Sequence, residues 1–282
     1  MGDTKIQWTD RTWNPLRARN KATGEVGWFC EHVSHGCDNC YAEKMNVNTY
    51  FGNGLEYKAS VLPQLELFLD EKMLDQPLHW RKGKKIFVCS MTDLFGRFVK
   101  DEWIEQMFSV MAKAAQHTFQ VLTKRPERMR EISERVPGLI DWPNVWLGVS
   151  VEDQKTADER IPLLLETPAT VRWISAEPLL DAVDLSAFMG VTSNITGERE
   201  QQYSMIDWVV VGGESGAGAR PMRLAWAESI IRRCESAGVP VFMKQLGTIW
   251  AQENKAKSFK GGDASEWPYQ HILNKRQYPV AA

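Results

Sequence analysis

The fold class follows from the stretch 145–175, VWLGVSVEDQKTADERIPLLLETPATVRWIS. It contains two short runs rich in β-branched and aromatic residues, Val145–Ser150 and Val171–Ser175, with little polar alternation. Such runs are typical of strands that are buried on both faces of a parallel sheet. Their starts lie 26 residues apart, which leaves room for a crossover helix between two parallel strands. The stretch therefore predicts a strand–helix–strand unit.

The same pattern recurs on both sides of this stretch. The further runs are Ile86–Ser90, Phe119–Thr123, Trp208–Gly212 and Val241–Lys244. The six starts follow one another at 33, 26, 26, 37 and 33 residues. Between runs, apolar residues recur at helical spacing in 103–114 and in 226–234, so we expect Cys234 in the core of a helix. With a short first strand near Lys5–Trp8, the pattern predicts an α/β fold: a complete or partial parallel (β/α) barrel of about six to eight strands.

Composition limits the protein's environment and its domain organisation. The chain has 282 residues, 34 of them basic and 36 acidic, so no overall charge favours nucleic acid or an anionic membrane. We find no run of eighteen apolar residues and no charged-then-apolar leader, and we expect a cytoplasmic protein with no membrane partner. We predict one barrel domain over residues 1–247, with an insertion near 184–204. A C-terminal extension, residues 248–282, is expected to pack on the barrel.

Polar residues follow every predicted strand, where the active site of a parallel barrel lies. The residues that we expect to be catalytic are Glu152, Glu177, Glu214 and Lys244. The residues that we expect to bind a cofactor are Tyr41, Ser90, Asp93, Ser150, Glu152, Ser175 and Gly213. Helix caps explain single serines at these positions well, but several carboxylates and a lysine at one rim favour a functional site.

A cysteine loop, residues 28–41, holds Cys30, Cys37 and Cys40 with the spacing C-x6-C-x2-C. Five cysteines in the chain, three of them within eleven residues, do not resemble a secreted disulfide framework and indicate metal ligation. Three thiolates can hold three irons of a 4Fe-4S cluster and leave the fourth iron open. An open iron can bind S-adenosylmethionine, whose reductive cleavage gives a 5′-deoxyadenosyl radical.

Zinc is the alternative metal for the cysteine loop. The three cysteines with His32 or His35 would complete a closed tetrahedral site of the structural kind. A cofactor loop at the mouth of a parallel barrel favours the cluster instead. Cys89, inside a predicted strand, is expected to be a core residue rather than a fourth ligand.

The chain resembles a known family through several motifs taken together. They are Trp13-Asn14-Pro15, Thr123-Lys124-Arg125-Pro126, Gly148-Val149-Ser150-Val151-Glu152, Glu177-Pro178-Leu179-Leu180 and Gly212-Gly213-Glu214-Ser215-Gly216, besides the cysteine loop. The resemblance is to a phage-borne three-cysteine-motif family of uncharacterised, radical-SAM-like proteins, and it covers nearly the whole chain. It implies a barrel with a cluster, and a cofactor met by Ser90 to Asp93, Glu152 and Ser175. The spacing departs from the radical-SAM signature C-x3-C-x-aromatic-C, because the first gap is six residues and Tyr41 follows the last cysteine.

Basic residues give a second prediction. Lys124, Arg125 and Arg220 lie on predicted loops and are candidates for contacts to a substrate or a phosphate, although a solvated helix face explains the first two as well. The Gly-rich turn 212–220 lacks the lysine of a P-loop. We expect an iron–sulfur enzyme with an electron donor as partner, acting on a nucleic-acid base or nucleotide. The alternatives are a zinc-stabilised nucleic-acid-binding protein and a non-radical iron–sulfur redox protein.

Overall fold

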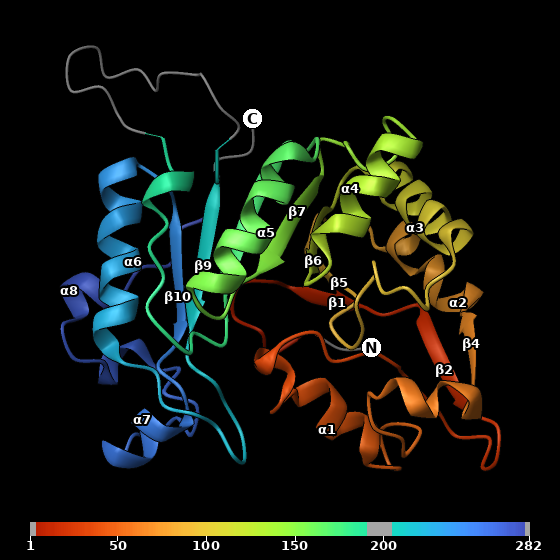
Figure 1. The fold of residues 1–282 in the computed structure, drawn as a ribbon, viewed down its shortest axis with the longest axis horizontal. Coiled ribbons are helices and arrows are strands. Elements are labelled where there is room, and N and C mark those ends of the chain that lie inside the picture. The colour runs from red at the N-terminus through yellow and green to blue at the C-terminus, as the bar shows by residue number, and fades with distance from the viewer. Residues whose placement is uncertain (1–3, 191–204, 280–282) are drawn as a thin grey trace. The chain divides into compact units, whose positions relative to one another are not determined.

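The computed structural model describes residues 4–190 and 205–279. The chain forms two compact units, an N-terminal unit, Met1–Trp146, and a C-terminal unit, Leu147–Ala282. Within the described residues, seven strands form one sheet in the order β1-β5-β6-β7-β8-β9-β10. They are β1 Arg11–Trp13, β5 Lys85–Val88, β6 Thr118–Thr123, β7 Val145–Ser150, β8 Val171–Ala176, β9 Trp208–Gly212 and β10 Val241–Gln245 (Figure 1).

The strand pairings confirm the α/β class and the parallel sheet. Strand β5 pairs in parallel with β1 and β6 in the N-terminal unit, and β9 pairs in parallel with β8 and β10 in the C-terminal unit. From β5 to β10, neighbours in the sheet follow chain order, as they do in a parallel (β/α) barrel. Every residue of β7 and of β9 is buried, which explains why these strands read as continuous apolar runs.

Two strand predictions require correction. Lys5–Trp8 is not a strand, and the first strand of the sheet is β1 instead. Trp8 is buried, and its ring packs on Phe87 with ring centroids 4.8 Å apart, so an aromatic residue that is buried outside any strand was read as part of one. Strand β5 ends at Val88, one residue before Cys89, whose φ of 56° leaves the extended region and turns the chain.

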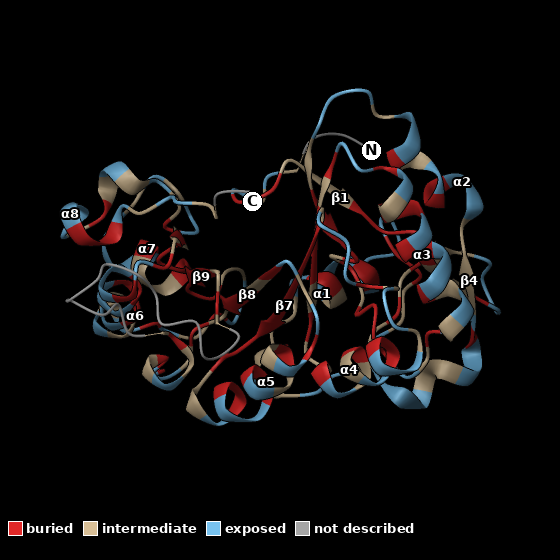
Figure 2. Cartoon of the chain, turned by 90° about the horizontal axis from the view of Figure 1, so that it is seen from above, coloured by how far each residue is buried: buried red, intermediate tan, exposed pale blue. Residues whose placement is uncertain are grey.

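A helix connects each pair of successive strands from β5 to β8 and from β9 to β10, as the spacing predicts. Between β8 and β9, the described residues hold only a short 3₁₀ turn, Ser186–Phe188. The helices that the structure describes are α1 Tyr41–Val47, α2 Glu71–Leu74, α3 Asp101–Lys113, α4 Pro126–Arg135, α5 Gln154–Glu166, α6 Leu224–Ala237, α7 Thr248–Glu253 and α8 Gln270–Leu273. The helical spacing in 103–114 and 226–234 is confirmed by α3 and α6, and Cys234 is fully buried in α6. Most strands in Figure 2 are coloured as buried, and the longer helices carry buried residues on one side and exposed residues on the other.

A small antiparallel sheet lies within the N-terminal unit and was not predicted. It has the strand order β3-β2-β4, with β3 Val26–Gly27, β2 Leu16–Asn20 and β4 Leu65–Leu69. Two buried amides join it to the start of the cysteine loop. The Asn53 side chain donates to the carbonyls of Ala18 and Trp28, and Asn46 Oδ1 accepts from the Trp28 amide at 2.8 Å.

The C-terminal extension lies along β10. Within it, the Gln277 amide donates to the Val241 carbonyl at 3.0 Å, and the Met243 amide donates to the Lys275 carbonyl at 2.8 Å. Most of the insertion predicted near 184–204 falls on 191–204, outside the described residues. Among the helices that the structure describes, none is long and apolar enough to span a bilayer.

Candidate metal centre

The cysteine loop belongs to the N-terminal unit and connects β3 to α1. Cys30 follows the strand, Cys37 ends a short 3₁₀ turn (His35–Cys37), and Cys40 precedes the first residue of α1. The Cys40 amide donates to the Cys37 carbonyl at 3.1 Å, so the last two cysteines share one turn. All three are free thiols.

Hydrogen bonds attach this loop to the residues that follow β5. Thr92 Oγ1 donates to the Phe29 carbonyl at 2.5 Å, and the Tyr41 hydroxyl donates to the Ser90 carbonyl at 2.6 Å. Tyr57, which packs beside the loop, donates to the Met91 carbonyl at 2.7 Å. Strand β5 therefore ends against the cysteine loop, where a parallel sheet presents its ligand sites.

Asp93 joins the ends of β5 and β6. Its carboxylate accepts from Thr123 Oγ1 at 2.7 Å, from the Lys124 amide at 3.0 Å and from Arg125 Nη1 at 3.3 Å. The Phe95 amide donates to it as well, at 3.0 Å. Asp93 is nearly buried, and these partners give it a role in holding two strand ends together.

Arg125 extends from the end of β6 to the cysteine loop. Its Nη2 donates to the Glu31 carbonyl at 3.2 Å and lies 3.5 Å from Glu31 Oε2. Only 13% of the side chain is exposed. Among the sequence-predicted residues, the structure thus brings Tyr41, Ser90, Asp93 and Arg125 together around the cysteines.

Burial dominates the electrostatics of the thiols of Cys30 and Cys40. Burial raises the pKa of Cys30 well above its usual range, and the charges of Asp93, Cys40 and Cys37 raise it further, while Arg125 lowers it. Burial also raises the pKa of Cys40. Ionising these thiols is therefore costly unless a cation is bound, and a metal supplies that positive charge.

The walls of the site are aromatic and sulfur-containing. Trp28, Tyr57 and Met91 pack with Cys30 and Cys40 in one cluster. The indole Nε1 of Trp28 is buried and has no hydrogen-bond partner among the described residues. A buried donor of this kind is costly when unsatisfied. The three free thiols supply the donor type and number that an iron–sulfur cluster with one open iron takes, so the residues present fit such a cluster.

The candidate fourth ligands differ in their surroundings. His32 Nε2 lies 2.8 Å from Glu43 Oε2, and His35 is exposed. Cys89 is buried, as predicted for a core residue, and the charges of Asp93 and Cys30 contribute to its raised pKa after burial. No three His, Cys, Asp or Glu side chains in the described ranges 4–190 and 205–279 stand in the arrangement of a preformed metal-ion site.

The predicted site residues of the C-terminal unit form ion pairs at strand ends. Glu152, after β7, is fully buried with Arg160 Nη1 at 3.0 Å, and the same nitrogen donates to the Ser150 carbonyl at 2.7 Å. Ser175 is buried, and its carbonyl accepts from the Val151 amide. These three predicted residues are enclosed by their own unit.

The other two pairs in this unit are less enclosed. Lys244 Nζ lies 3.0 Å from Glu177 Oε1, with side chains 22% and 12% exposed. Glu214 receives hydrogen bonds from the Arg220 amide, Nε and Nη2 at 2.7, 3.0 and 2.6 Å. The Gly213 amide donates to the Gln245 carbonyl, so the Gly-rich turn is tied to the end of β10.

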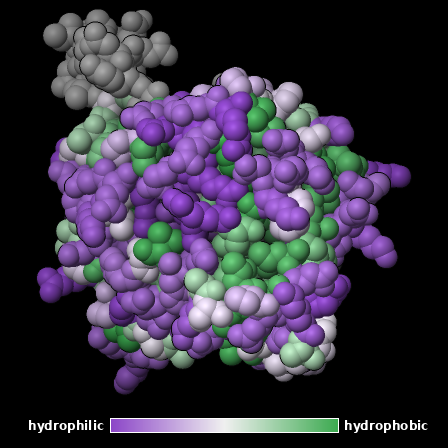
Figure 3. Space-filling view, turned by 45° about the vertical axis from the view of Figure 1, so that its right-hand side comes forward, coloured by the Kyte–Doolittle hydropathy of each residue, from purple (hydrophilic) through white to green (hydrophobic). Residues whose placement is uncertain are grey.

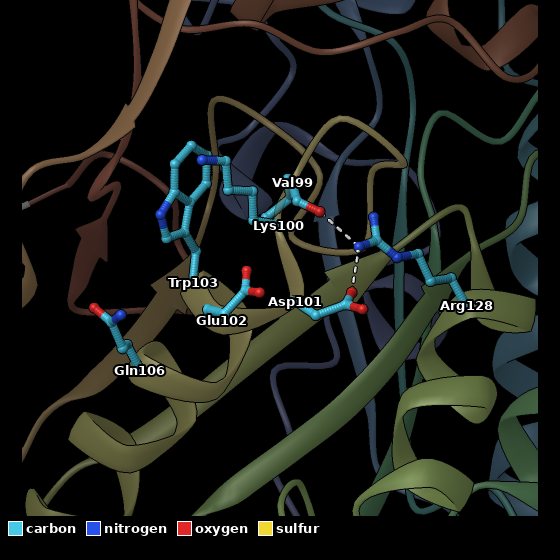
Figure 4. Close-up of a pocket in the computed structure, with 7 residues that line it drawn as sticks. All are labelled: Val99, Lys100, Asp101, Glu102, Trp103, Gln106 and Arg128. Carbon is cyan, nitrogen blue, oxygen red and sulfur yellow. Dashed lines mark hydrogen bonds and ion pairs between the residues drawn. The ribbon is translucent and has the colours of Figure 1, made fainter.

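The remaining basic residues near α4 are also engaged. Arg128 donates to the Gly96 carbonyl and to the Val99 carbonyl, and pairs with Asp101 at 2.7 Å. Beside it is an open hollow of about 680 Å³ at the start of α3, with Trp103 and Lys100 on its wall (Figure 4). Its residues include none of the predicted site residues. The face drawn in Figure 3 is mostly hydrophilic, with apolar residues gathered in one region.

Sequence reasoning predicts the cysteines as metal ligands but misses the residues that pack on or bond to their loop. Asn46, Asn53 and Tyr57 lie outside every motif, and the only signal for them is a group of polar residues between two apolar segments. A comparison with protein families gives a match over residues 3–271, to the family described as protein of unknown function (DUF5131). No curated protein and no solved structure matches the chain.

Proposed function

This chain belongs to the DUF5131 family, and we propose that it is an iron–sulfur enzyme of the radical S-adenosylmethionine type. A 4Fe-4S cluster would be held by Cys30, Cys37 and Cys40. The observation that carries the proposal is the attachment of the cysteine loop to the ends of β5 and β6 through Thr92, Tyr41 and Arg125.

Three further features support a cluster at this position. The thiols of Cys30 and Cys40 have raised pKa values that a bound cation would offset. The Trp28 indole N–H lacks an acceptor among the described residues. Three cysteines also leave one iron of the cluster without a protein thiolate.

When bound, such a cluster supplies an electron for cleavage of S-adenosylmethionine and so gives access to radical chemistry. The chain's own residues then have separate tasks. Tyr41 and Thr92 fix the loop, and the aromatic wall of Trp28 and Tyr57 keeps water from the thiolates. In the C-terminal unit, the half-buried pair Glu177–Lys244 is suited to holding or moving a proton between Oε1 and Nζ.

The proposed substrate class is a nucleic-acid base or nucleotide. This part of the proposal rests on the resemblance to phage-borne proteins. Arg220 supports it, because its guanidinium is 29% exposed although it pairs with Glu214. The electron donor is proposed to be a low-potential one-electron carrier.

The first experiment is anaerobic purification followed by analysis of iron, sulfide and zinc and by visible absorption. Wild type is compared with Cys37→Ala and with Cys234→Ala, a matched control in the core of α6. We expect about four irons and four sulfides per chain in wild type and in the control, and their loss in Cys37→Ala. Formation of 5′-deoxyadenosine from S-adenosylmethionine by the reduced protein then tests the radical chemistry.

Two results would contradict the proposal at different levels. One zinc per chain and no iron, even after anaerobic reconstitution, would replace the cluster with a structural zinc site. A stable cluster without cleavage of S-adenosylmethionine would leave an iron–sulfur redox protein.

A further inference from the structure

We propose that Arg125 is the counter-charge of the cysteine site and a positioning residue that sets the reduction potential of the cluster bound there. The inference rests on the proposed function and adds to it a determinant of the site's redox behaviour. The sequence alone predicts Arg125 as a contact to a substrate or a phosphate, and in the structure its side chain contacts Asp93 and Glu31.

The geometry directs the guanidinium at the protein and not at solvent. Nη1 points to Asp93 and Nη2 to the main-chain oxygen of Glu31, the residue next to Cys30. The side chain is 13% exposed, and its charge acts on the Cys30 thiol. A cation held this way stays beside the first cysteine whether or not a ligand is bound.

Charge explains why this position affects electron transfer. One-electron reduction, with the electron supplied by an external low-potential donor, adds one negative charge to a site that already carries thiolates. A fixed cation in a water-poor environment stabilises the reduced form, and local charge is one of the factors that set cluster potentials. Asp93 and Glu31 act in the opposite direction, and they also fix the guanidinium in place.

The planar guanidinium suits both tasks. Its two terminal nitrogens reach two acceptors in sequence segments about 60 residues apart, Glu31 and Asp93, whereas a lysine supplies the same charge from a single atom. The effect of the positive charge can therefore be measured separately from the effect of the two hydrogen-bonded contacts, to Glu31 and Asp93. Arg125→Lys keeps the charge and weakens the contacts to Glu31 and Asp93, and Arg125→Gln removes the charge.

The test is a spectroelectrochemical titration of the reconstituted full-length protein, with dithionite as the reductant. The variants are Arg125→Gln, Arg125→Lys and the control Arg130→Gln, which removes the same charge from α4, where Arg130 faces Glu134 at 3.4 Å. We expect the equilibrium constant for reduction to fall roughly tenfold in Arg125→Gln, a shift of about 59 mV to more negative potential. Arg125→Lys should restore most of the shift, and Arg130→Gln should show none.

Asp93→Asn provides a second readout, with an expected shift to more positive potential. Loss of the cluster in Arg125→Gln but not in Arg125→Lys would also support the counter-charge. An intact cluster with unchanged potential in Arg125→Gln would overturn this inference alone. Loss of the cluster in both Arg125 variants, together with an unchanged reduction potential in Asp93→Asn, would also overturn this inference alone. A wild-type protein without iron would instead overturn the proposed function and this inference with it.

Discussion

In the N-terminal unit, charged side chains at the strand ends hold a loop, whereas in the C-terminal unit they pair with one another. Asp93 and Arg125 connect β5 and β6 to the cysteine loop. In contrast, Glu152, Glu177 and Glu214 each meet a cation supplied by their own unit. The same residue types after parallel strands therefore serve two purposes.

The ion pairs of the C-terminal unit also differ in burial. A fully buried pair serves stability, whereas a pair with some exposure is a candidate for a role in catalysis. Glu152 is fully buried and Arg160 nearly so, which leaves no access for a substrate. The pair Glu177–Lys244 keeps part of both side chains in contact with solvent. Charged residues at strand ends are therefore informative about function only when their partners and exposure are known.

The largest expected effect on the free energy of unfolding comes from the buried pair Glu152–Arg160. Arg160→Met removes the arginine partner of a buried carboxylate and the donor to the Ser150 carbonyl, so we expect a loss of about 3 to 5 kcal/mol in the free energy of unfolding. Chemical denaturation monitored by circular dichroism measures it. The control Arg232→Met, in an exposed pair with Glu228, should cost less than about 1 kcal/mol.

A second variant tests whether Arg160 acts through Glu152. Glu152→Gln combined with Arg160→Met should recover part of the loss, because no charge is then buried without its partner. Equal losses of unfolding free energy in Arg160→Met and Arg232→Met would mean that burial does not make the pair Glu152–Arg160 more important for stability than an exposed pair.

A smaller effect is expected at Gly212, the last residue of β9. A Cβ at this position would overlap the Glu177 carboxylate, and overpacking of this kind costs about 1 to 3 kcal/mol. Gly212→Ala should therefore destabilise the protein by that amount and displace Glu177 from Lys244. Thermal and denaturant unfolding give the cost, and a crystal structure of the variant gives the displacement.

The double variant Gly212→Ala with Glu177→Ala is the control for that steric explanation. Truncating Glu177 removes the atoms that the new methyl group would meet, so the two costs should be less than additive. Strict additivity would mean that Gly212 is needed for its backbone and not for the space that it leaves.

The comparison also shows what a sequence can predict. Strands β7 and β9 have their predicted bounds, because burial on both faces favours an almost continuous run of apolar residues. The segment Lys5–Trp8 misled the prediction, since the tertiary packing of a tryptophan gives the same local signal as a strand. Strand β2 was missed although its burial alternates, because five residues with two arginines carry too weak a pattern.

For the candidate site, the sequence predicts which residue types lie near one another but not which residues form hydrogen bonds or ion pairs with them. The spacing of the cysteines is local, so the sequence alone is enough to predict the loop as a candidate site. Arg125 was predicted to contact a substrate or a phosphate, and the pattern gave no sign of its contacts with Asp93 and with Glu31, which lies 94 residues earlier in the chain. Such partners depend on how β5 and β6 end in space, which no local pattern specifies.

The smallest expected effect on stability concerns the pair Glu177–Lys244. It tests whether this pair differs from the buried pair Glu152–Arg160 in its importance for stability. Lys244→Met removes a cation whose side chain is 22% exposed and leaves Glu177, which is 12% exposed, in partial contact with water, so the cost should be about 1 to 2 kcal/mol. Because Lys244 belongs to the C-terminal unit, the iron content should stay at the wild-type value. Denaturant unfolding and iron analysis on the same preparation measure both. A loss above about 3 kcal/mol would place Lys244 with Arg160 among the structural cations and leave the C-terminal unit without a candidate proton carrier in this pair.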